Sequence, residues 1–411
     1  MKIIIIADYG FADGGAPKVA LESAAGLADL GHEVVFVAAV REAPGMALVR
    51  HPGVTHVNLG LEDVWSLPLP RAAVSGIWNR EAGRRLLAAL RVHAGPDTVV
   101  HLHQWTKCLS PAAFAAIFRA DLPLVVTCHD YFISCPTGLF YRFDTQHACA
   151  LTPLSGACLA APCDPRSSAH KAIRVLRSFA TRRAISPGKL TFVHVSDRGR
   201  ATVERFLPKD ARHVRIDNPV AIARGAGADM GQGARKAFYL GRITVEKGAL
   251  VAACAAREAG VPIVFVGDGP AAVEVRRLNR QAEMRPWIDA AAVGDLLRRE
   301  ALMLVAPSRW PETGPLTIFE AMAVGVPVVG SLLSGAAEKL VDGRSGFVVA
   351  PEVAACAAAM RRLAGGDAAV RIGAQAFGDY WTSPLTLERH VKTLTGVYRD
   401  ILDGELPVPA R

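Results

Sequence analysis

Short apolar runs alternate with helical periodicity along almost the whole chain. Each run has the length of a strand, and each intervening stretch has the spacing of a helix. This alternation is typical of parallel sheets, because a helix must carry the chain back before the next parallel strand begins. The predicted strands of the first series are Lys2–Ala7, Val34–Ala39, Val99–Leu102, Leu124–Thr127 and Leu190–Val195.

The series restarts after Asn218-Pro219 with the predicted strands Phe238–Leu240, Ile263–Gly267, Leu302–Ala306 and Val326–Gly330. A chain of 411 residues suits two domains of about 200 residues each. We therefore predict an α/β protein with two doubly wound, Rossmann-like domains facing across a cleft. Residues 1–218 form the first domain and 219–380 the second, with the Gly- and Ala-rich stretch 220–235 at the boundary. Residues 381–411 can return to the first domain.

Composition excludes several classes of protein. The hydrophobic fraction of 51% excludes a largely disordered chain. Met1–Ala7 is too short an apolar run for a signal peptide, and no apolar run approaches the roughly 18 residues of a membrane-spanning helix. The net charge of +9 favours anionic partners, but sparse aromatic residues and the lack of a known binding module argue against nucleic acid. We expect a cytoplasmic protein, with any membrane contact made peripherally at the inner face.

A basic stretch can supply that contact. It is helix-like, contains no acid, and has Ile173, Leu176 and Phe179 or Ala180 on one face. Such a helix can lie on an anionic bilayer, and the alternative is the solvated face of an ordinary helix. Its cations are Arg166, Lys171, Arg174, Arg177, Arg182, Arg183 and Lys189.

The most informative segment is Pro307–Val329, which places two carboxylates around a helix start. Glu312 lies in a loop broken by prolines and Gly314, and Glu320 lies on a predicted helix that spans Leu316–Val324. The free amides of the first helical turn and the helix dipole can hold a phosphate, while the two carboxylates accept hydrogen bonds from hydroxyls. A phosphate next to polyols describes a nucleotide sugar.

Further strand ends carry groups that fit such a ligand. Arg242 and Lys247 follow a strand of the second domain and can neutralise a diphosphate as it leaves. Gly267 and Gly269 form a tight turn after the next strand, where the backbone can pack against a base or a sugar. Surface ion pairing is the alternative for either cation taken alone.

The first domain offers a glycine turn and a histidine. Gly14 and Gly15 lie between the first strand and a helix that runs to about Leu30, without the spacing of a dinucleotide fold or a P-loop. His129 and Asp130 end a strand, and this histidine can bind a sugar hydroxyl or shuttle a proton. A structural histidine is the alternative. His101 and His103 end the preceding strand, and we expect them to be structural or to face the acceptor.

These motifs together resemble glycosyltransferase family 4, whose members are retaining enzymes of GT-B fold. The resemblance rests on the motifs above and on Glu320-Ala321-Met322-Ala323 followed by Gly325 and Pro327, and it spans nearly the whole chain. It implies a UDP- or GDP-linked sugar donor, transfer with retained configuration, and no required metal or other cofactor. Arg242 and Lys247 are implied to bind the phosphates, Glu320 the ribose and Glu312 the sugar, with the Gly15 backbone near the phosphates.

One departure affects the donor loop. Many family members read Glu-Pro-Phe-Gly before the helix, whereas this chain reads Glu312-Thr313-Gly314-Pro315-Leu316. The phosphate-binding amides are then expected at Gly314, Leu316 and Thr317, and the sugar preference of other members cannot be transferred. The resemblance implies that the configuration of the sugar is retained without a protein nucleophile, because the leaving phosphate oxygen itself helps to deprotonate the acceptor.

An insertion over residues 131–166 contains Cys135, Cys149, Cys158 and Cys163, with His147 nearby. Four thiolates can close a tetrahedral zinc site, although the spacing lacks the paired Cys-x2-Cys of typical zinc motifs. The stretch resembles an insertion in capsule and exopolysaccharide members of the family. We expect a structural metal clip beside the acceptor.

The leading prediction is a hexosyltransferase that extends a surface glycan, such as exopolysaccharide, capsule or lipopolysaccharide, on a lipid-linked acceptor. One alternative is a transferase for a soluble acceptor, as in sucrose or trehalose synthesis. A catalytically idle sugar-nucleotide-binding protein and an epimerase of the same fold are the others. The base, the sugar, the linkage and the oligomeric state do not follow from the sequence.

Overall fold

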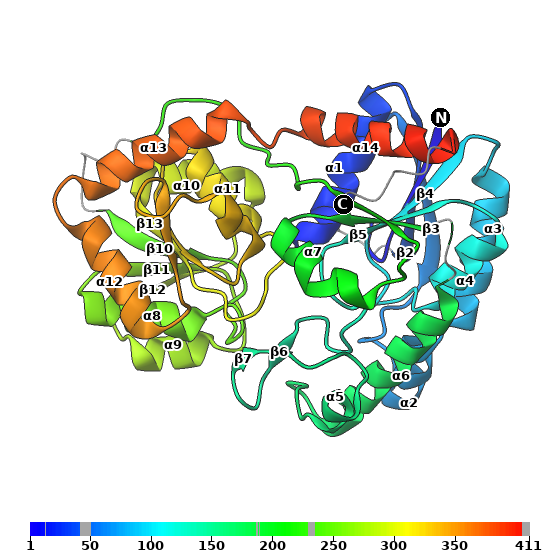
Figure 1. Cartoon of the computed structure of the whole chain (residues 1–411), viewed down its shortest axis with the longest axis horizontal. Coiled ribbons are helices and arrows are strands. Elements are labelled where there is room, and N and C mark those ends of the chain that lie inside the picture. Colours follow the sequence, from blue (N-terminus) through cyan, green and yellow to red (C-terminus); the bar gives the residue numbers. More distant parts are fainter. Residues whose placement is uncertain (13, 42–50, 186–187, 189, 229–234, 405–411) are drawn as a thin grey trace. The chain divides into compact units, whose positions relative to one another are not determined.

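The computed structural model describes residues 1–12, 14–41, 51–185, 188, 190–228 and 235–404. The chain folds as two compact units, which Figure 1 shows in sequence colours. The first unit contains Met1–Phe140, Ala150–Pro219 and Leu387–Arg411, and the second contains Tyr141–Cys149 and Val220–Thr386. The chain passes from one unit to the other between Pro219 and Val220, and its last helix belongs to the first unit. Residues 229–234 of the expected boundary stretch and residues 405–411 of the expected returning segment lie outside the described residues.

The first unit is built on one parallel sheet with the order β3-β2-β1-β4-β5-β8-β9. The order runs outward from β1 in both directions, so the sheet is doubly wound as predicted. β1, β4, β5 and β8 are buried along nearly their whole length because helices cover the sheet. The strands are β1 Lys2–Ala7, β2 Glu33–Val40, β3 Val54–Leu61, β4 Thr98–Leu102, β5 Leu124–Cys128, β8 Leu190–His194 and β9 Arg212–Arg215.

Eight helices belong to this unit within the described residues. Four of them begin with a side-chain cap, as at α3, where the Asn79 side chain accepts a hydrogen bond from the Ala82 amide at 3.0 Å. They are α1 Gly15–Asp29, α2 Leu69–Ile77, α3 Arg80–His93, α4 Ala112–Arg119, α5 Gly156–Ala160, α6 Ser168–Ala184, α7 Asp197–Val203 and α14 Leu387–Leu402. A short 3-10 turn, Glu204–Phe206, follows α7.

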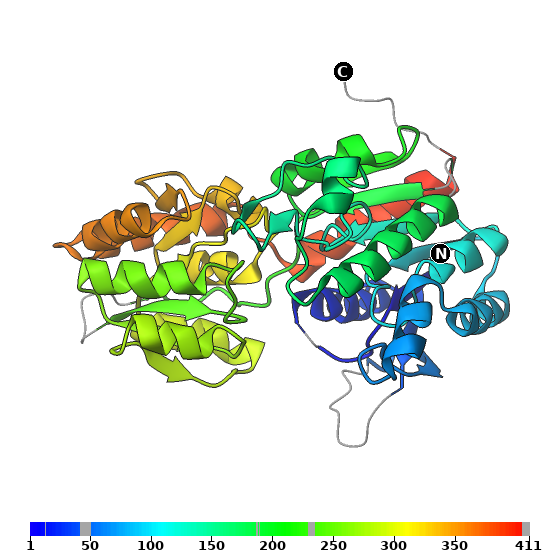
Figure 2. The same cartoon turned by 90° about the horizontal axis from the view of Figure 1, so that it is seen from below.

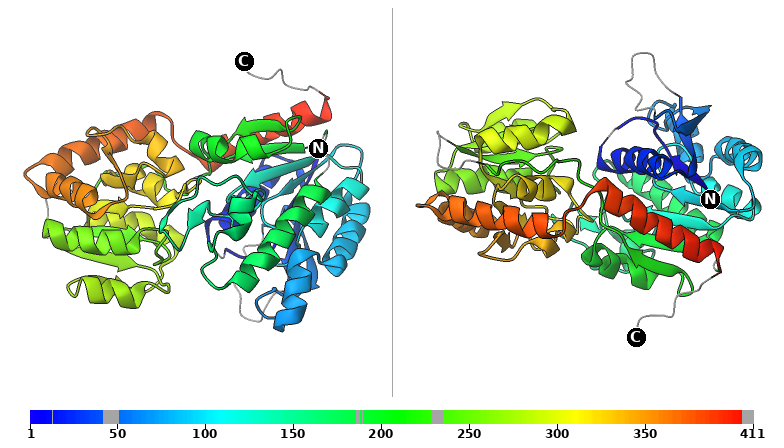
Figure 3. Two further views of the ribbon diagram at one scale, coloured as in Figure 1. Left: turned by 60° about the horizontal axis from the view of Figure 1, so that its bottom comes forward. Right: turned by 90° about the horizontal axis from the view of Figure 1, so that it is seen from above.

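The C-terminal helix α14 packs beside α1, as Figures 1 and 3 show. Val391, Leu394 and Tyr398 of α14 join one core with the odd-numbered residues of β1. His390 adds a polar contact, because its Nε2 lies 3.0 Å from Oγ of Ser23 on α1. The last helix is therefore part of the first unit's core.

The second unit has a second parallel sheet with the order β12-β11-β10-β13-β14-β15. It too is doubly wound, starting from β10. The strands are β10 Lys236–Leu240, β11 Ile263–Val266, β12 Glu283–Arg285, β13 Ala301–Ala306, β14 Val328–Ser331 and β15 Gly346–Val349. A separate antiparallel hairpin, β6 Tyr141–Arg142 with β7 His147–Ala148, is assigned to this unit as well.

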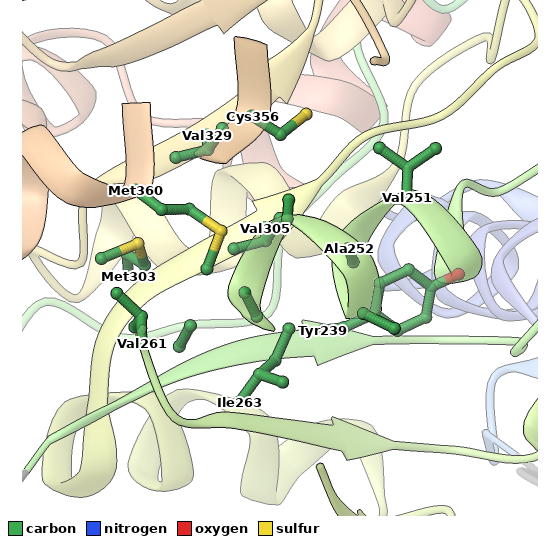
Figure 4. Packing of buried hydrophobic residues seen from close by; sticks show 14 of the residues in the cluster. Tyr239, Val251, Ala252, Val261, Ile263, Met303, Val305, Val329, Cys356 and Met360 are labelled. Carbon is green, nitrogen blue, oxygen red and sulfur yellow. The ribbon is translucent and has the colours of Figure 1, made fainter. Parts of the chain in front are cut away.

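Helices cover both faces of this sheet (Figure 2). Successive residues of β10 point to opposite faces, so that Tyr239 packs with α8 and α12 (Figure 4) and Phe238 packs with α10, α11 and α13. The helices are α8 Ala249–Ala259, α9 Ala272–Leu278, α10 Ala290–Glu300, α11 Leu316–Ala323, α12 Val353–Ala364 and α13 Ala368–Thr382, with a 3-10 turn at Gly335–Lys339. The predicted α/β class with two doubly wound sheets is confirmed.

Candidate functional site

In the second unit, the predicted donor residues lie in three loops at one edge of the sheet. The loops follow β10, β11 and β13, which are adjacent strands. Because the strands are parallel, their carboxyl ends meet at the same edge, and the topological switch point falls between β10 and β13. The predicted residues in these loops or on the helix that follows are Arg242, Lys247, Gly267, Gly269, Glu312, Gly314, Leu316, Thr317 and Glu320.

Lys247 and Glu312 form a direct ion pair across this switch point. Lys247 Nζ donates to Glu312 Oε1 at 2.7 Å, and the Ser308 hydroxyl donates to the other carboxylate oxygen. The Glu312 side chain is 9% exposed and that of Lys247 is 26% exposed. The carboxylate is therefore held by two donors, while the ammonium remains accessible to a ligand.

Two glycines allow the loops to come this close. Gly248 has φ 77°, and a Cβ built on it would lie 2.0 Å from the carbonyl oxygen of Pro307. Gly267 has φ 136°, and its Cβ would lie 2.2 Å from the carbonyl oxygen of Gly241. A side chain at either position would push the β10 loop away from a neighbouring loop.

The helix start in the β13 loop is open, as predicted. The N-cap residue of α11 is Pro315, and it makes no side-chain capping hydrogen bond. Leu316 and Thr317 form the first turn and are partly exposed, whereas Glu320 is 5% exposed. The amides at this helix start are suited to an anion.

Other polar groups at this edge are available for a ligand. Arg242 is exposed in the β10 loop. Thr244 Oγ1 and Ser334 Oγ are buried and have no hydrogen-bond partner among the described residues. Ser334 lies next to Gly335, whose amide donates to the Glu312 carbonyl at 2.8 Å. A buried hydroxyl without a partner is costly, and a bound ligand can satisfy it.

In the first unit, His129 lies against His103 at the ends of β5 and β4. The His129 Nε2 and His103 Nδ1 atoms are 3.0 Å apart, and the rings stack with centroids 5.2 Å apart. Burial, aided by the charge on His390, lowers the pKa of His129 to about 3. The pair is therefore neutral near pH 7, so this histidine is suited to hydrogen bonding and not to taking up a proton.

The pKa of Asp130, unlike that of His129, is shifted toward physiological pH. Its Oδ1 accepts a hydrogen bond from the Phe132 amide at 2.9 Å, while burial raises its pKa to about 6. Part of its side chain stays exposed. A carboxyl with a pKa near 6 can exchange a proton close to physiological pH.

A small pocket lies beside these groups. His103 Nε2 and Gln104 Oε1 are buried without a hydrogen-bond partner among the described residues. They offer polar contacts to a hydroxylated ligand. The pocket is lined by His103, Gln104, Trp105, Thr106, Val126, Thr127, Cys128, Asp130 and Ile133.

The sequence analysis did not single out Asp8 for the site. This buried residue follows β1 and accepts hydrogen bonds from the amides of Lys107, Cys108 and Leu109 at 2.8, 3.0 and 3.1 Å. Burial raises its pKa despite these bonds. The carboxyl fixes the loop after β4, which carries His103. A charged residue directly after an apolar strand was the available signal.

Gly14 and Gly15 lie at the start of α1. Gly14 has φ 98°, and a Cβ on either glycine would meet no atom within 4 Å. The neighbouring Asp13 lies outside the described residues. The role of these two glycines in donor binding stays a prediction.

The predicted basic face, whether in contact with a membrane or with solvent, is wrong for three of its cations. Lys171, Arg174 and Arg177 point inward from α6, because the neighbouring insertion supplies acceptors. Arg174 Nε lies 3.1 Å from Asp164 Oδ2, and Arg177 donates to the Pro136 carbonyl at 3.3 Å. Burial, with the nearby Arg174, lowers the pKa of Arg177 to about 10. Lys189 lies outside the described residues.

The four cysteines do not form the expected metal site in the described structure. No group of three or more His, Cys, Asp or Glu side chains among the described residues is placed to hold a metal ion. Lys171 Nζ instead donates to Cys163 Sγ at 2.7 Å and to the Cys158 carbonyl at 3.0 Å. An ammonium beside a thiol opposes a second cation there, so the set Cys135, Cys149, Cys158 and Cys163 does not fit zinc in this arrangement. Whether the protein binds zinc stays a prediction.

Two family models match the chain. The glycosyl transferase 4-like domain matches residues 14–219, and the glycosyl transferases group 1 family matches residues 234–365. Glycogen synthase of Mycobacterium tuberculosis is 27% identical over 406 residues, which cover 92% of this chain and 89% of that protein.

Solved structures show the same arrangement of elements. Sucrose-phosphate synthase from Thermosynechococcus elongatus matches with a TM-score of 0.71 at 16% identity, covering 98% of this chain and 100% of that one. HepE from Anabaena, in complex with UDP and glucose, matches with a TM-score of 0.67 at 15% identity, covering 97% and 100%. No helix of the described residues is long and apolar enough to span a membrane.

Proposed function

The chain belongs to the glycosyl transferase 4-like family and is a glycosyltransferase of GT-B fold, and on this premise we propose that it transfers a hexose from a nucleotide diphosphate sugar to a growing surface glycan. The configuration at the transferred carbon is retained. The donor binds at the edge of the second unit's sheet that carries Lys247 and Glu312.

The Lys247–Glu312 pair beside the open start of α11 carries this proposal. A sugar diphosphate brings two kinds of group, anionic oxygens and neutral hydroxyls. Lys247, Arg242 and the amides of Gly314, Leu316 and Thr317 are suited to the first kind, and the carboxylates of Glu312 and Glu320 to the second. The site therefore holds donors and acceptors in the combination that this ligand requires.

The same cations support the chemical step. When the bond from the sugar to the phosphate breaks, negative charge grows on the leaving diphosphate, and Lys247 and Arg242 lie on fixed loops to stabilise it. The departing phosphate oxygen accepts the proton of the acceptor hydroxyl on the same face of the sugar, so no protein nucleophile is assigned. No divalent cation is required, because the protein itself supplies the positive charge.

For the donor we favour uridine diphosphate over guanosine diphosphate, because the similar HepE was solved with UDP and glucose. For the acceptor we favour a lipid-linked glycan, reached by a protein that lies peripherally on the inner face of the cell membrane. His103 and Asp130 line a pocket suited to its hydroxyls, with His129 packed against His103 and the Asp130 carboxylate as a hydrogen-bond acceptor that orients the reacting hydroxyl. The net charge of +9 suits an anionic membrane surface.

A soluble acceptor is the second candidate. The similarity to a glycogen synthase over 92% of the chain, and the fold shared with a sucrose-phosphate synthase, favour it. This alternative keeps the same donor site and predicts full turnover on a small sugar or soluble glucan without lipid.

Thermal-shift measurements with UDP, GDP, ADP, CMP and their sugar conjugates test the donor proposal. A ligand at 100 times its dissociation constant adds roughly 2.7 kcal/mol to the free energy of unfolding. We expect the uridine series to stabilise the wild type and not Arg242→Ala/Lys247→Ala. Stabilisation of both proteins to the same extent would refute the site, and stabilisation of neither would count against the binding of these nucleotides by the free protein.

A further inference from the structure

Helix α6 of the first unit has its polar and apolar faces reversed. Lys171, Arg177 and Thr181 on its inner face are 5%, 8% and 0% exposed. Leu176 and Phe179 on its outer face are 53% and 46% exposed. A surface helix of a water-soluble protein normally shows the opposite distribution. The reversal leaves apolar side chains on the face that the first unit itself does not cover.

Polar partners explain the inward cations but not the outward apolar residues. Lys171 is satisfied by carbonyls and a thiol, Arg174 by Asp164, and Arg177 by the Pro136 carbonyl and the ring of Phe132, 4.6 Å from its guanidinium carbon. Nothing in the described part of this unit covers Leu176 and Phe179 to a similar degree. Their exposure indicates a function outside the unit's own core.

The neighbouring helix α2 carries further exposed apolar residues. α2 packs against α6, and Figures 1 and 3 show the two together at one margin of the first unit. No residue of α2 is buried, and its Leu69 and Val74 are 66% and 68% exposed. Trp65, which precedes α2, is 46% exposed and lies under the guanidinium of Arg166, 3.8 Å from the ring centroid. We call Trp65, Leu69, Val74, Leu176 and Phe179 the α2–α6 surface.

The charge around this surface is positive. The sequences of α2 and α6 contain no acid. Arg166, Arg182 and Arg183 are exposed around α6. Three acids beside this surface already have partners: Asp164 with Arg174 at 3.1 Å, Glu62 with Arg71 at 3.9 Å, and Asp63 with the Trp65 amide at 2.8 Å and the Tyr9 hydroxyl. Apolar side chains and a tryptophan bordered by arginines match the interface of an anionic bilayer, with acyl chains below and phosphate groups above.

We propose that the α2–α6 surface docks on an anionic lipid bilayer, with Leu176 and Phe179 entering the headgroup layer and the arginines binding lipid phosphates. This proposal rests on the membrane setting of the proposed function and identifies the surface that serves it. The inner face of α6 lies near the acceptor-side residues, because the Arg177 guanidinium stacks on the ring of Phe132, whose amide donates to Asp130.

Co-sedimentation of the full-length protein with vesicles tests this proposal. The vesicles contain phosphatidylcholine alone or with about 30% phosphatidylglycerol, a content that supplies the anionic surface. Leu176→Gln/Phe179→Gln removes apolar contact without changing charge, and Val92→Gln on α3 is the control, because Val92 is 77% exposed but lies on another helix. We expect the double variant to lower the partition coefficient on anionic vesicles by about 10-fold or more and the control to leave it unchanged. Equal thermal midpoints verify that all variants fold.

A second variant separates charge from insertion. Arg182→Gln/Arg183→Gln is expected to weaken binding to anionic vesicles and to reduce its dependence on salt, without affecting the weak binding to neutral vesicles. The proposal would be overturned if the wild type binds neither kind of vesicle, or if Leu176→Gln/Phe179→Gln binds as the wild type does. It would also be overturned if the wild type self-associates and Leu176→Gln/Phe179→Gln abolishes self-association without changing vesicle binding. Vesicle binding requires no nucleotide, so its failure would leave the donor-site test untouched.

Discussion

The two units carry different electrostatics at the same edge of a similarly wound sheet. Each sheet winds outward from a central strand, β1 in one and β10 in the other, and each carries polar residues at the carboxyl ends of its central strands. In the second unit these residues are an opposed ammonium and carboxylate, and the ammonium is partly exposed. In the first unit they are two stacked histidines and a carboxyl, and burial moves their pKa values toward the neutral forms.

The difference between charged groups in the second unit and neutral groups in the first matches the charge of the ligands that we expect each unit to bind. A diphosphate needs cations that stay charged, so Lys247 is kept near water and near an anion. An acceptor hydroxyl is neutral, so neutral imidazoles can recognise it by hydrogen bonds. The difference supports the proposal that the second unit binds the charged donor and the first unit the uncharged acceptor, and each part of the proposal can be tested separately.

The largest expected effect is at the charged switch point. Glu312→Gln preserves the shape of the side chain but releases Lys247 and weakens the contact to the sugar. We expect kcat/KM to fall by about 10²- to 10³-fold in an initial-rate assay with the donor sugar, the range seen when one preorganised electrostatic group is removed.

The matched control lies at the other end of the same strand. Glu283 accepts a hydrogen bond from Lys236, the first residue of β10, at the same 2.7 Å distance. Because that pair is surface-exposed and away from the loops, Glu283→Gln should change kcat/KM by less than about twofold. Equal losses in the two variants would mean that Lys247–Glu312 is an ordinary ion pair.

An intermediate effect is expected in the pH dependence of acceptor transfer. Burial raises the pKa of Asp130 to about 6, so the carboxylate dominates above pH 6 and the neutral acid dominates below it. If the carboxylate orients the acceptor hydroxyl by accepting its hydrogen bond, kcat/KM for the acceptor falls by about tenfold per pH unit below 6. Asp130→Asn should remove this acidic limb and lower the plateau. An unchanged limb in the variant would assign the titration to another group.

The smallest effect is expected at the neutral histidine pair. His103→Phe keeps an aromatic ring but removes Nε2 and the contact to His129. Loss of one neutral hydrogen bond should raise the KM for the acceptor by about 3- to 10-fold, while nucleotide stabilisation stays unchanged. His194→Phe is the control, since His194 at the end of β8 forms a similar stacked pair with His213, with nitrogens 2.9 Å apart. A similar rise in KM for both variants would indicate loss of packing instead of acceptor recognition.

The sequence determined the fold class because buried parallel strands are continuous apolar runs. The bounds of β1 agree with the prediction, and those of β5, β8, β11 and β13 agree to within a residue or so. β9, Arg212–Arg215, was not predicted, because a polar strand at the sheet edge has no apolar run. The loops were also predicted from the sequence, since Arg242, Lys247 and Glu312 each lie in the segment between an apolar strand and the next helix.

Only the tertiary structure decided which of these groups meet and which way they face. The order of strands, which brings β10 beside β13, makes a pair of Lys247 and Glu312 although 65 positions separate them. The order of strands also brings His103 against His129. It places the carboxyl of Asp8 under the loop that carries His103. In α6, helical periodicity identified two faces correctly, but an insertion that supplies carbonyls and Asp164 turned the cationic face inward. Periodicity is a local property of the chain, whereas the face that becomes buried depends on the partners that distant segments bring to it.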